Sequence, residues 1–356
     1  MQEFSLKIRE DFRRDGLFLN FLVDGHLMRL LAESFPYSRI NVGYPGICSE
    51  EYNLCEKIVT ALQDLPVETS VVGHARRSHL EKMAKIIQDS NNSAANFWIP
   101  ISDYFVERTL AMPTEKVIDY SKEMIKYWKN DLSNSPIDIA LVDCTNELEN
   151  LGQRLKYSYN ELISAGARSI IVCDTLGKTD PRKLDILLKD LPNNSGNLEF
   201  HPHNDNGHAL ENIKVAVAKG FTHVGTSVFG YGERGTMIDP RQLVQDYNIP
   251  FVQSKFLEFE KEYKDLILTL SESDEVLIDS QIVTGTQYRL LDRKYDALLG
   301  FGVTSDKYVL AKMIGLDPKE LSSNILQEMK NRLYKQRRRI LRGQDLIDLL
   351  KEVSCQ

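Results

Sequence analysis

Two histidines separated by a single residue, His201 and His203, end a short apolar stretch in the segment "LEFHPHNDNG". The chain has only 7 histidines among 356 residues, so this spacing is unusual. In an extended chain, residues two apart point the same way, and both imidazoles can reach one point. Two imidazoles and a carboxylate form a facial set that binds a divalent metal and leaves positions open for substrate and water. Asp15 in "RRDG" is the best candidate for the carboxylate.

The elements that must position these residues alternate along the chain. From Phe4 to about Val228, short β-branched runs alternate with longer amphipathic segments, which is typical of repeated strand and helix units. About eight such units close a (β/α)8 TIM barrel in roughly 250 residues. An open doubly wound sheet shows the same alternation, but it usually has a glycine-rich phosphate loop after its first strand, and none follows here. We expect strands at 4–8, 39–43, 69–73, 96–101, 138–143, 169–174, 198–201 and 223–228.

The chain changes character after Pro250. The segments "FLEFEKEYKDLILTL" and "LSSNILQEMKNRLYKQRRRILRGQDLIDLLKEV" have strong helical patterns. We therefore expect an α/β fold with a TIM-barrel catalytic domain over residues 1–250, followed by a mainly helical C-terminal region over residues 251–356. That region is too short to form another barrel.

Composition narrows the classes of function. A net charge of -7 and a pI near 5.6 argue against nucleic acid as the main partner, because phosphate binding needs concentrated positive charge. The chain has no run of about 18 apolar residues and no signal-peptide pattern, so we expect a soluble, cytoplasmic protein without a membrane partner. The 5 cysteines are scattered without a C-x-x-C pair, which indicates reduced structural thiols. A small-molecule substrate fits these properties best.

In such a barrel the chemistry lies at the C-terminal ends of the strands, so the polar residues that follow each apolar run are the candidates. Arg14 and Asp15 follow the first run, and Glu233 and Arg234 follow the eighth. The candidates for substrate contact between these ends are His74, Arg76, Ser102, Thr145 and Thr175. Asp103, Asp143 and Asp174 lie beside them.

Each of these features also has a purely structural explanation. His74 and Arg76 are equally well explained as part of a polar loop, and Glu233 and Arg234 as an ion pair with each other. Trp98 is interpreted as a packing residue. An isolated H-x-H pattern would favour a structural pair, and only its place after the seventh strand, together with the Arg-Asp pair after the first, favours a metal site.

Taken in order, four motifs resemble those of the DRE-TIM metallolyase superfamily. Its members include isopropylmalate synthase, homocitrate synthase, citramalate synthase and, more distantly, hydroxymethylglutaryl-CoA lyase. The resemblance spans most of the chain, and the combination of motifs is far more specific than any single one. The segments that carry it are "RRDG" (13–16), "CDTLGKTDP" (173–181), "HPHNDNG" (201–207) and "GYGERG" (230–235).

The resemblance implies a site and a reaction. Asp15, His201 and His203 would bind a divalent cation, namely zinc, magnesium or manganese, while Arg14 stabilises the carbonyl oxygen and Thr175 holds the carboxylate of a 2-oxo acid. The implied reaction is a Claisen-type condensation in which acetyl-CoA, or another acyl-CoA, loses an α-proton and its enolate attacks the ketone. Thioester hydrolysis then releases a 2-hydroxy diacid and CoA. The resemblance also implies a homodimer in which the partner's C-terminal region covers the active site.

Three positions depart from the family pattern. Met237 stands where an asparagine near the metal is common, and a thioether is a poor ligand for a hard cation. Leu17 and Phe18 replace a Glu-Gln pair, which favours a bulkier or less polar acceptor than 2-oxoglutarate. Gln287, at the end of "TGTQ", stands where a catalytic histidine is expected.

Glutamine cannot act as a general base near neutral pH. Tyr288, His74 or another group must then move the α-proton, and we assign catalytic roles to Tyr288 and Glu233 beside Arg14 and Thr175. Two alternatives stay open. One is a metal-dependent aldolase or lyase that cleaves a 2-hydroxy acid or an acyl-CoA on the same barrel, and the other is a catalytically inactive barrel that acts as a binding subunit.

Overall fold

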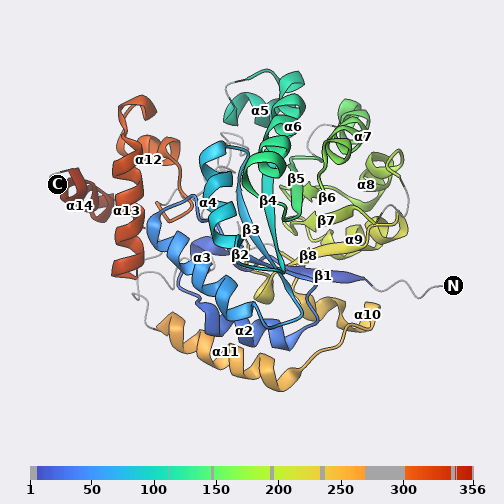
Figure 1. The fold of residues 1–356 in the computed structure, drawn as a ribbon, viewed down its shortest axis with the longest axis horizontal. Helices are drawn as coiled ribbons and strands as arrows, with labels where there is room; N and C mark the ends of the chain where they lie inside the picture. The colour runs from blue at the N-terminus through green and yellow to red at the C-terminus, as the bar shows by residue number, and fades with distance from the viewer. Residues whose placement is uncertain are drawn as a thin grey trace.

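The computed structural model describes residues 6–110, 112–145, 148–192, 196–232, 237–268, 301–337, 341 and 343–354. Within them, eight parallel strands close into a barrel in the order β1 to β8, with β1 paired to both β2 and β8. Helices surround this barrel (Figure 1). The (β/α)8 TIM barrel predicted from the alternating pattern is confirmed.

The strands agree closely with the apolar runs of the sequence, apart from the first. The predicted strand 4–8 starts outside the described residues; within them β1 begins at Lys7, which pairs with His223 of β8. β1 extends beyond the predicted end to Glu10, and its Arg9 pairs with Arg39 of β2. These charged residues hide the strand from a search for apolar runs. The strands are β1 Lys7–Glu10, β2 Arg39–Gly43, β3 Glu68–His74, β4 Ser93–Pro100, β5 Ile137–Val142, β6 Ser169–Asp174, β7 Leu198–Pro202 and β8 His223–Thr226.

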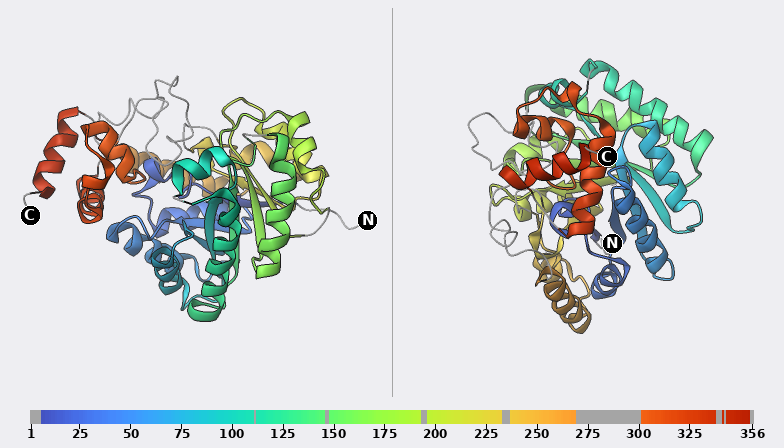
Figure 2. Two further views of the ribbon diagram at one scale, coloured as in Figure 1. Left: turned by 90° about the horizontal axis from the view of Figure 1, so that it is seen from above. Right: turned by 90° about the vertical axis from the view of Figure 1, so that its left-hand side faces the viewer.

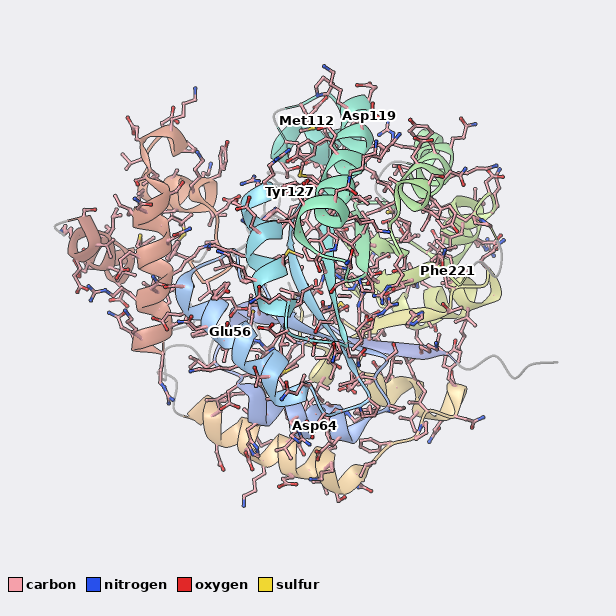
Figure 3. The ribbon with its side chains drawn as sticks, viewed as in Figure 1. Glu56, Asp64, Met112, Asp119, Tyr127 and Phe221 are labelled. Atoms are coloured by element: carbon pink, nitrogen blue, oxygen red, sulfur yellow. The ribbon has the colours of Figure 1, made fainter. Side chains whose placement is uncertain are left out.

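The helices are amphipathic, with one apolar face toward the strands. Glu56 on α3 and Asp119 on α6 are exposed on the outside, whereas Phe221 before β8 is fully buried (Figure 3). The α-helices are α1 Leu17–Asn20, α2 Gly25–Ser34, α3 Ser49–Leu62, α4 Arg77–Ile87, α5 Asp103–Thr109, α6 Val117–Tyr127, α7 Leu148–Ala165, α8 Pro181–Leu188, α9 Ala209–Ala218, α10 Val244–Tyr247, α11 Gln253–Leu268, α12 Lys307–Ile314, α13 Ser323–Gln336 and α14 Gly343–Ser354. Short turns of other helix types are η1 Thr114–Lys116, η2 Trp128–Leu132, η3 Val228–Gly230, η5 Pro240–Leu243 and η8 Pro318–Glu320.

The N-terminal ends of the strands carry a network of buried charges. Arg9 Nη1 donates to Glu199 Oε2 at 2.7 Å, and Ser169 Oγ lies within hydrogen-bond distance, 2.7 Å, of both Glu199 Oε1 and Asp138 Oδ1. Buried charges are tolerated only when they are paired and hydrogen-bonded. Further ion pairs join Arg39 and Arg168 to the carboxylates of Glu68, Asp138 and Glu199. This network closes the end of the barrel opposite to the one where catalytic residues are expected.

The C-terminal region is mainly helical, as predicted. α11 packs along α2, and its Phe256, Phe259 and Tyr263 belong to the same buried cluster as the barrel strands. α13 packs against α3, and α14 lies on the far side of α13 (Figures 1 and 2). Residues of α12 to α14 form a second apolar cluster, which includes the fully buried Leu17 and Phe21 of the barrel. The division at residue 250 stays a prediction. No helix of the described residues is long and apolar enough to cross a membrane.

A buried ion pair between the loop after β1 and α3 also accepts a hydrogen bond from α13. Arg13 Nη2 donates to Glu51 Oε2 at 2.7 Å, both side chains are fully buried, and the Tyr334 hydroxyl of α13 donates to the same carboxylate. Arg13 also donates to the backbone oxygens of Asn20, Val23 and Val42. β2 ends in Gly43, with a φ of 133°, because a Cβ there would lie 2.0 Å from Glu51 Oε1.

Substituting Glu51 with alanine is therefore expected to lower the free energy of unfolding by about 3–5 kcal/mol, because it leaves the Arg13 guanidinium buried without its counter-charge. Urea denaturation followed by circular dichroism measures this change. The matched variant Tyr334→Phe loses one hydrogen bond and should lose about 1 kcal/mol. Equal losses in the two variants would show that the ion pair itself adds nothing.

Candidate metal centre

The loop after β1 and the end of β7 bring the three predicted ligands together. In the loop, Asp15 N–H donates to Asp11 O at 2.9 Å, and the Asp15 carboxylate faces the end of β7. His201 lies in β7 and His203 directly follows it, so both rings extend from one side of the same extended segment. Opposite them, β8 carries Gly225, where a Cβ would lie 2.8 Å from His201 Nδ1. Only glycine leaves room for the histidine at this point.

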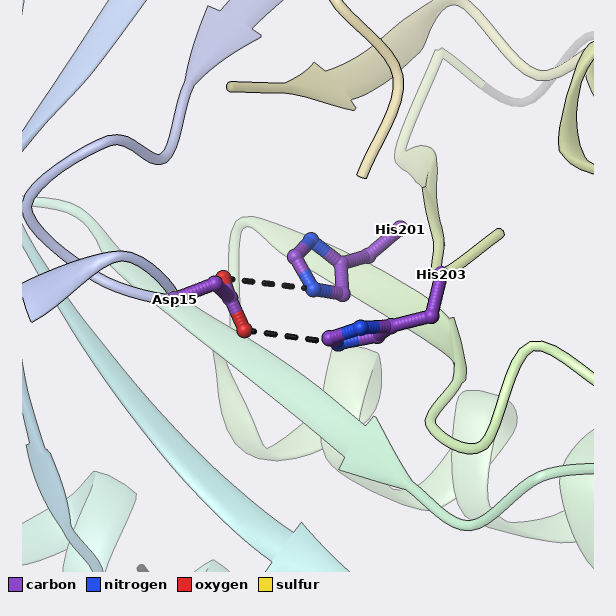
Figure 4. Close-up of side chains that lie close together, drawn as sticks. All are labelled: Asp15, His201 and His203. Atoms are coloured by element: carbon purple, nitrogen blue, oxygen red, sulfur yellow. Dashed lines mark ion pairs between the residues drawn. The ribbon is translucent and has the colours of Figure 1, made fainter. Parts of the chain in front are cut away.

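The side chains of Asp15, His201 and His203 face one another (Figure 4). His201 Nε2 lies 3.3 Å from Asp15 Oδ2, and His203 Nε2 lies 3.4 Å from Asp15 Oδ1. One ligand atom from each residue lies within 4.8 Å of the other two. The side chains are almost completely buried, with Asp15 the most exposed at 9%. The predicted triad is thus assembled at the C-terminal end of the barrel.

The donor set of the triad fits a divalent cation. His201 Nε2 and Asp15 Oδ2 are buried 3.3 Å apart, and neither atom has a hydrogen bond of good geometry, so both are available as ligand atoms. Burial alone would raise the pKa of Asp15, but His201 and His203 hold it well below its usual value, so the carboxylate is ionised. Imidazole nitrogens with one carboxylate oxygen suit zinc, manganese and similar ions.

A second carboxylate, Asp11, orients the His201 ring. Asp11 Oδ2 lies 2.9 Å from His201 Nδ1, and Arg9 Nε donates to Asp11 Oδ1 at 3.1 Å, while the Asn41 amide donates to the same oxygen. Burial acts to raise the pKa of Asp11, yet Arg9 and His201 bring it down to about 2. An ionised carboxylate at Nδ1 favours the tautomer with hydrogen on Nδ1, which leaves the Nε2 lone pair for a metal.

Asp11→Asn is expected to weaken the affinity for a divalent metal by roughly 10- to 100-fold, the usual effect of losing such an outer partner. Competition of the purified protein with a fluorescent chelator measures the affinity directly. Asp180→Asn, which alters an exposed helix cap of α8, serves as the control. An unchanged affinity in Asp11→Asn would exclude an orienting role for Asp11.

Arg14 lies beside the triad on the same loop. Its Nε is 3.6 Å from Asp15 Oδ2, and its Nη1 is buried without a hydrogen-bond partner. Although burial opposes the charge, Asp15 and Asp11 keep the pKa of Arg14 above its ordinary value. The site therefore holds a permanent cation with a donor directed away from the protein's own acceptors, as stabilisation of a developing oxyanion requires.

The polar residues after β4, β5 and β6 form a second hydrogen-bonded group at the same end of the barrel. The Ser102 hydroxyl donates to Asp143, and Asp143 N–H donates to Thr175 Oγ1 at 2.7 Å. Thr145 Oγ1 donates to Asp174 Oδ1 at 2.7 Å, and burial raises the pKa of Asp174 to about 6. Asp143 has a φ of 61°, a strained conformation for a residue with a side chain and one often found at functional sites.

The remaining predicted residues are distributed around this end. His74, at the end of β3, is half-buried, and its ring lies 4.5 Å from Trp98, which is itself half-buried. Arg76 is exposed at the start of α4. Met237 forms an antiparallel bridge with His203, so it does lie next to the triad. Glu233, Arg234, Gln287 and Tyr288 lie outside the described residues.

The sequence analysis missed Asp11 and the two residues that hold it, Arg9 and Asn41. A signal was present, because "KIRED" places four charged residues in or directly after a strand of a barrel whose strands are mostly buried and apolar. Charged residues in such a strand need partners inside the barrel. This pattern indicated an internal ion-pair network, although it could not name the histidine at its end.

A family model described as HMGL-like matches residues 26–245, which is more than half of the chain. The chain belongs to the HMGL-like family. This confirms the resemblance to the DRE-TIM synthases and lyases, which rested on motifs that lie partly outside the matched range.

Known proteins similar to this HMGL-like chain include synthases and lyases. The 2-isopropylmalate synthase 1 of Caldanaerobacter subterraneus is 26% identical over 200 residues, which cover 55% of this chain and 49% of that protein. The HMG-CoA lyase of Brucella melitensis has a similar fold, with a TM-score of 0.58 and 18% identity over 74% of this chain and 99% of that one. A similar lyase from Acinetobacter baumannii, solved with coenzyme A and 3-methylmalate, has a TM-score of 0.57 and 16% identity over 75% and 92% of the two chains. The chain spans about half the length of the curated relatives it matches.

Proposed function

We propose that this chain catalyses the metal-dependent condensation of an acyl-CoA, acetyl-CoA in the first instance, with a 2-oxo acid, giving a 2-hydroxy diacid and CoA. The observation that carries the proposal is the buried triad of Asp15, His201 and His203 with the Arg14 guanidinium beside it. The condensation, and not another reaction of the family, is favoured by relatives that are named 2-isopropylmalate synthase.

The residues of the chain have separate roles in this proposal. Asp15, His201 and His203 would hold the divalent ion, which when bound supplies a Lewis acid that polarises the ketone. Arg14 stabilises the negative charge that develops on the ketone oxygen as the new carbon–carbon bond forms. Thr175, whose Oγ1 accepts a hydrogen bond from Asp143 N–H, is assigned to bind the carboxylate of the 2-oxo acid.

Removal of the α-proton of the acyl-CoA needs a base. Tyr288 and His74 are the groups assigned to this step, and Glu233 to a supporting catalytic role. Ser102, Thr145 and Arg76 are assigned to substrate binding. The homodimer and the cytoplasmic location also stay predictions.

Thiol release from acetyl-CoA, measured against a panel of 2-oxo acids with and without added divalent metal, tests the function. We expect release that depends on both the 2-oxo acid and the metal, with apolar acceptors preferred over 2-oxoglutarate. Absence of 2-oxo-acid-dependent release with every acceptor and acyl-CoA would contradict the proposal.

The second candidate is a lyase or aldolase that uses the same metal site, because Gln287 replaces the histidine expected in the synthases. Incubating 2-hydroxy diacids or acyl-CoA adducts with the enzyme and metal, without free CoA, distinguishes the two. If carbonyl products form at a higher rate than CoA is released in the condensation assay, cleavage is the favoured reaction.

A further inference from the structure

A cavity of about 260 Å³ lies among the outer helices of the barrel, where η1 and the start of α6 face the middle of α7. α6 and α7 are neighbours on the outside of the barrel (Figure 1). The apolar lining consists of Pro100 and Ile101 at the end of β4, with Val117 and Ile118 of α6. Protein interiors contain few voids larger than a water molecule, so a space of this size needs an explanation. No member of the metal triad is among the described residues that line it.

Ser158 of α7 lines this cavity with a buried hydroxyl group that has no partner. The residue is fully buried, and its Oγ makes no hydrogen bond within the described part of the chain. A buried serine in a helix can bond to the carbonyl four residues earlier, as Ser34 and Ser121 do, each at 2.7 Å. A buried hydroxyl without a partner destabilises the fold. Ser158 therefore indicates a bound group that completes its hydrogen bonding.

The charges around the cavity favour a neutral ligand. Arg154 Nη1 donates to Ile101 O at 2.7 Å and lies 3.0 Å from Asp103 Oδ1. Hydrogen bonding by Arg154 holds the pKa of Asp103 below its usual value, so the carboxylate is ionised and compensates the guanidinium. The exposed Glu115, which also lines the cavity, adds a negative charge. An anionic ligand would therefore enter the cavity without a free counter-charge among its described lining residues.

The volume and the lining define the size and class of the ligand. An apolar cavity of about 150 Å³ holds benzene, so 260 Å³ accommodates a molecule with about ten non-hydrogen atoms. An aliphatic or aromatic body matches the apolar lining, and one hydroxyl or carbonyl oxygen matches Ser158. Tyr157, another lining residue, is 52% exposed, so the cavity can be reached from solvent.

We propose that this cavity, which we call the α6–α7 pocket, binds a small neutral molecule with a mainly apolar body and one hydroxyl or carbonyl group. The proposal goes beyond the condensation and does not depend on it.

The α6–α7 pocket adjoins the group that is predicted to bind substrate. Ile101, in the wall of the pocket, donates its N–H to Val142 O at the end of β5 at 3.2 Å. The next residue, Ser102, donates its hydroxyl to Asp143. A ligand in the pocket would therefore contact the short segment that positions Ser102 at the catalytic end of the barrel.

Calorimetric titration of the full chain with cuminyl alcohol, p-cymene and cuminate tests the α6–α7 pocket. These probes share an isopropylphenyl body and differ in one group, which is a hydroxymethyl, a methyl or a carboxylate. Cuminyl alcohol should bind about fivefold more tightly than p-cymene, as one added hydrogen bond implies, and cuminate at least about tenfold more weakly than the alcohol, because its charge would be buried without a partner. Ser158→Ala should weaken binding of the alcohol about fivefold and leave that of p-cymene unchanged.

Ser158→Leu fills the pocket and should abolish binding of all three probes without lowering the melting temperature. Ser121→Leu is the matched variant, since Ser121 is an equally buried serine of α6 that is not among the described lining residues. It should lower the melting temperature, because a leucine there overpacks the core. Ser121→Ala should bind cuminyl alcohol as the wild type does.

Several results would overturn the pocket as a binding site for a neutral ligand. They are no saturable binding of cuminyl alcohol by the wild type, equal affinity for it in Ser158→Leu, or tighter binding of cuminate than of the alcohol. An equal loss for the alcohol and p-cymene in Ser158→Ala would overturn the role of the hydroxyl. Because these titrations contain no 2-oxo acid, acyl-CoA or metal, a failure of thiol release would refute the condensation and leave the pocket intact.

Discussion

Replacing His201 with alanine is expected to abolish stoichiometric divalent metal in the purified protein and, with it, metal-dependent thiol release. The ring supplies one of three ligand atoms that lie within 4.8 Å of one another, and a set of two ligands holds a divalent ion far more weakly. The loss in affinity should exceed the roughly 100-fold that removal of an outer partner causes. Metal analysis of the dialysed protein measures the content, and chelator competition measures the affinity.

The matched control is His26→Ala. His26 lies on the exposed face of α2 and pairs with Glu262 at 2.9 Å, with 59% of its side chain exposed. It should keep the full metal content and rate. If His201→Ala retained stoichiometric metal, the triad would be a structural ion-pair cluster, and the alternative of an inactive barrel would gain support.

Arg14→Met is expected to reduce kcat by about 100- to 1,000-fold while the metal content stays the same, because the guanidinium donor acts on charge that develops during bond formation. The KM for the 2-oxo acid should change much less, since the interaction is stronger in the transition state than with the bound substrate. Steady-state kinetics of thiol release, with metal analysis of the same samples, measure both quantities.

Arg14→Lys keeps a positive charge but not the planar, multiply donating group, so it should restore only part of the rate. Arg29→Met, which removes an exposed arginine paired with Asp64 on the outside of the barrel, should leave kcat unchanged. If Arg14→Met raised the KM for the 2-oxo acid and left kcat unchanged, Arg14 would act in substrate binding and not in stabilisation of the transition state.

Much of the fold could be predicted because each barrel strand is a local signal. Runs such as "SIIVCD" are buried along their whole length. A run of apolar β-branched residues can be recognised as a buried strand without knowing which strands pair with it. The predicted first strand stopped short of Arg9 and Glu10 because both residues are charged. Its position depends on partners in β7, such as Glu199 for Arg9, about 190 residues away.

The same distinction applies to the candidate site. The triad could be predicted because two ligands are adjacent in one strand and the third belongs to a recognisable motif. The role of Asp11 could not, since it depends on His201, 190 residues away, and on Asn41 of β2, which approach Asp11 only when the barrel closes. Trp98 packs on the buried residues Phe105 and Leu176, as predicted, and it also lies beside His74 at the catalytic end.

The contact of Tyr334 with Glu51 limits where this protein can be truncated or fused to another protein. Ending the protein before α13 would not yield a catalytic barrel without an appendage, because Leu17 and Phe21 would lose their cover and the Arg13–Glu51 pair would meet water. The proposed metal ligand Asp15 lies only two residues from Arg13 in the sequence. A shortened protein would therefore be damaged first at this candidate site. Fusions with a tag or a second protein should use the surface of α14 or the loop before β5, and should leave the contact between α3 and α13 unchanged.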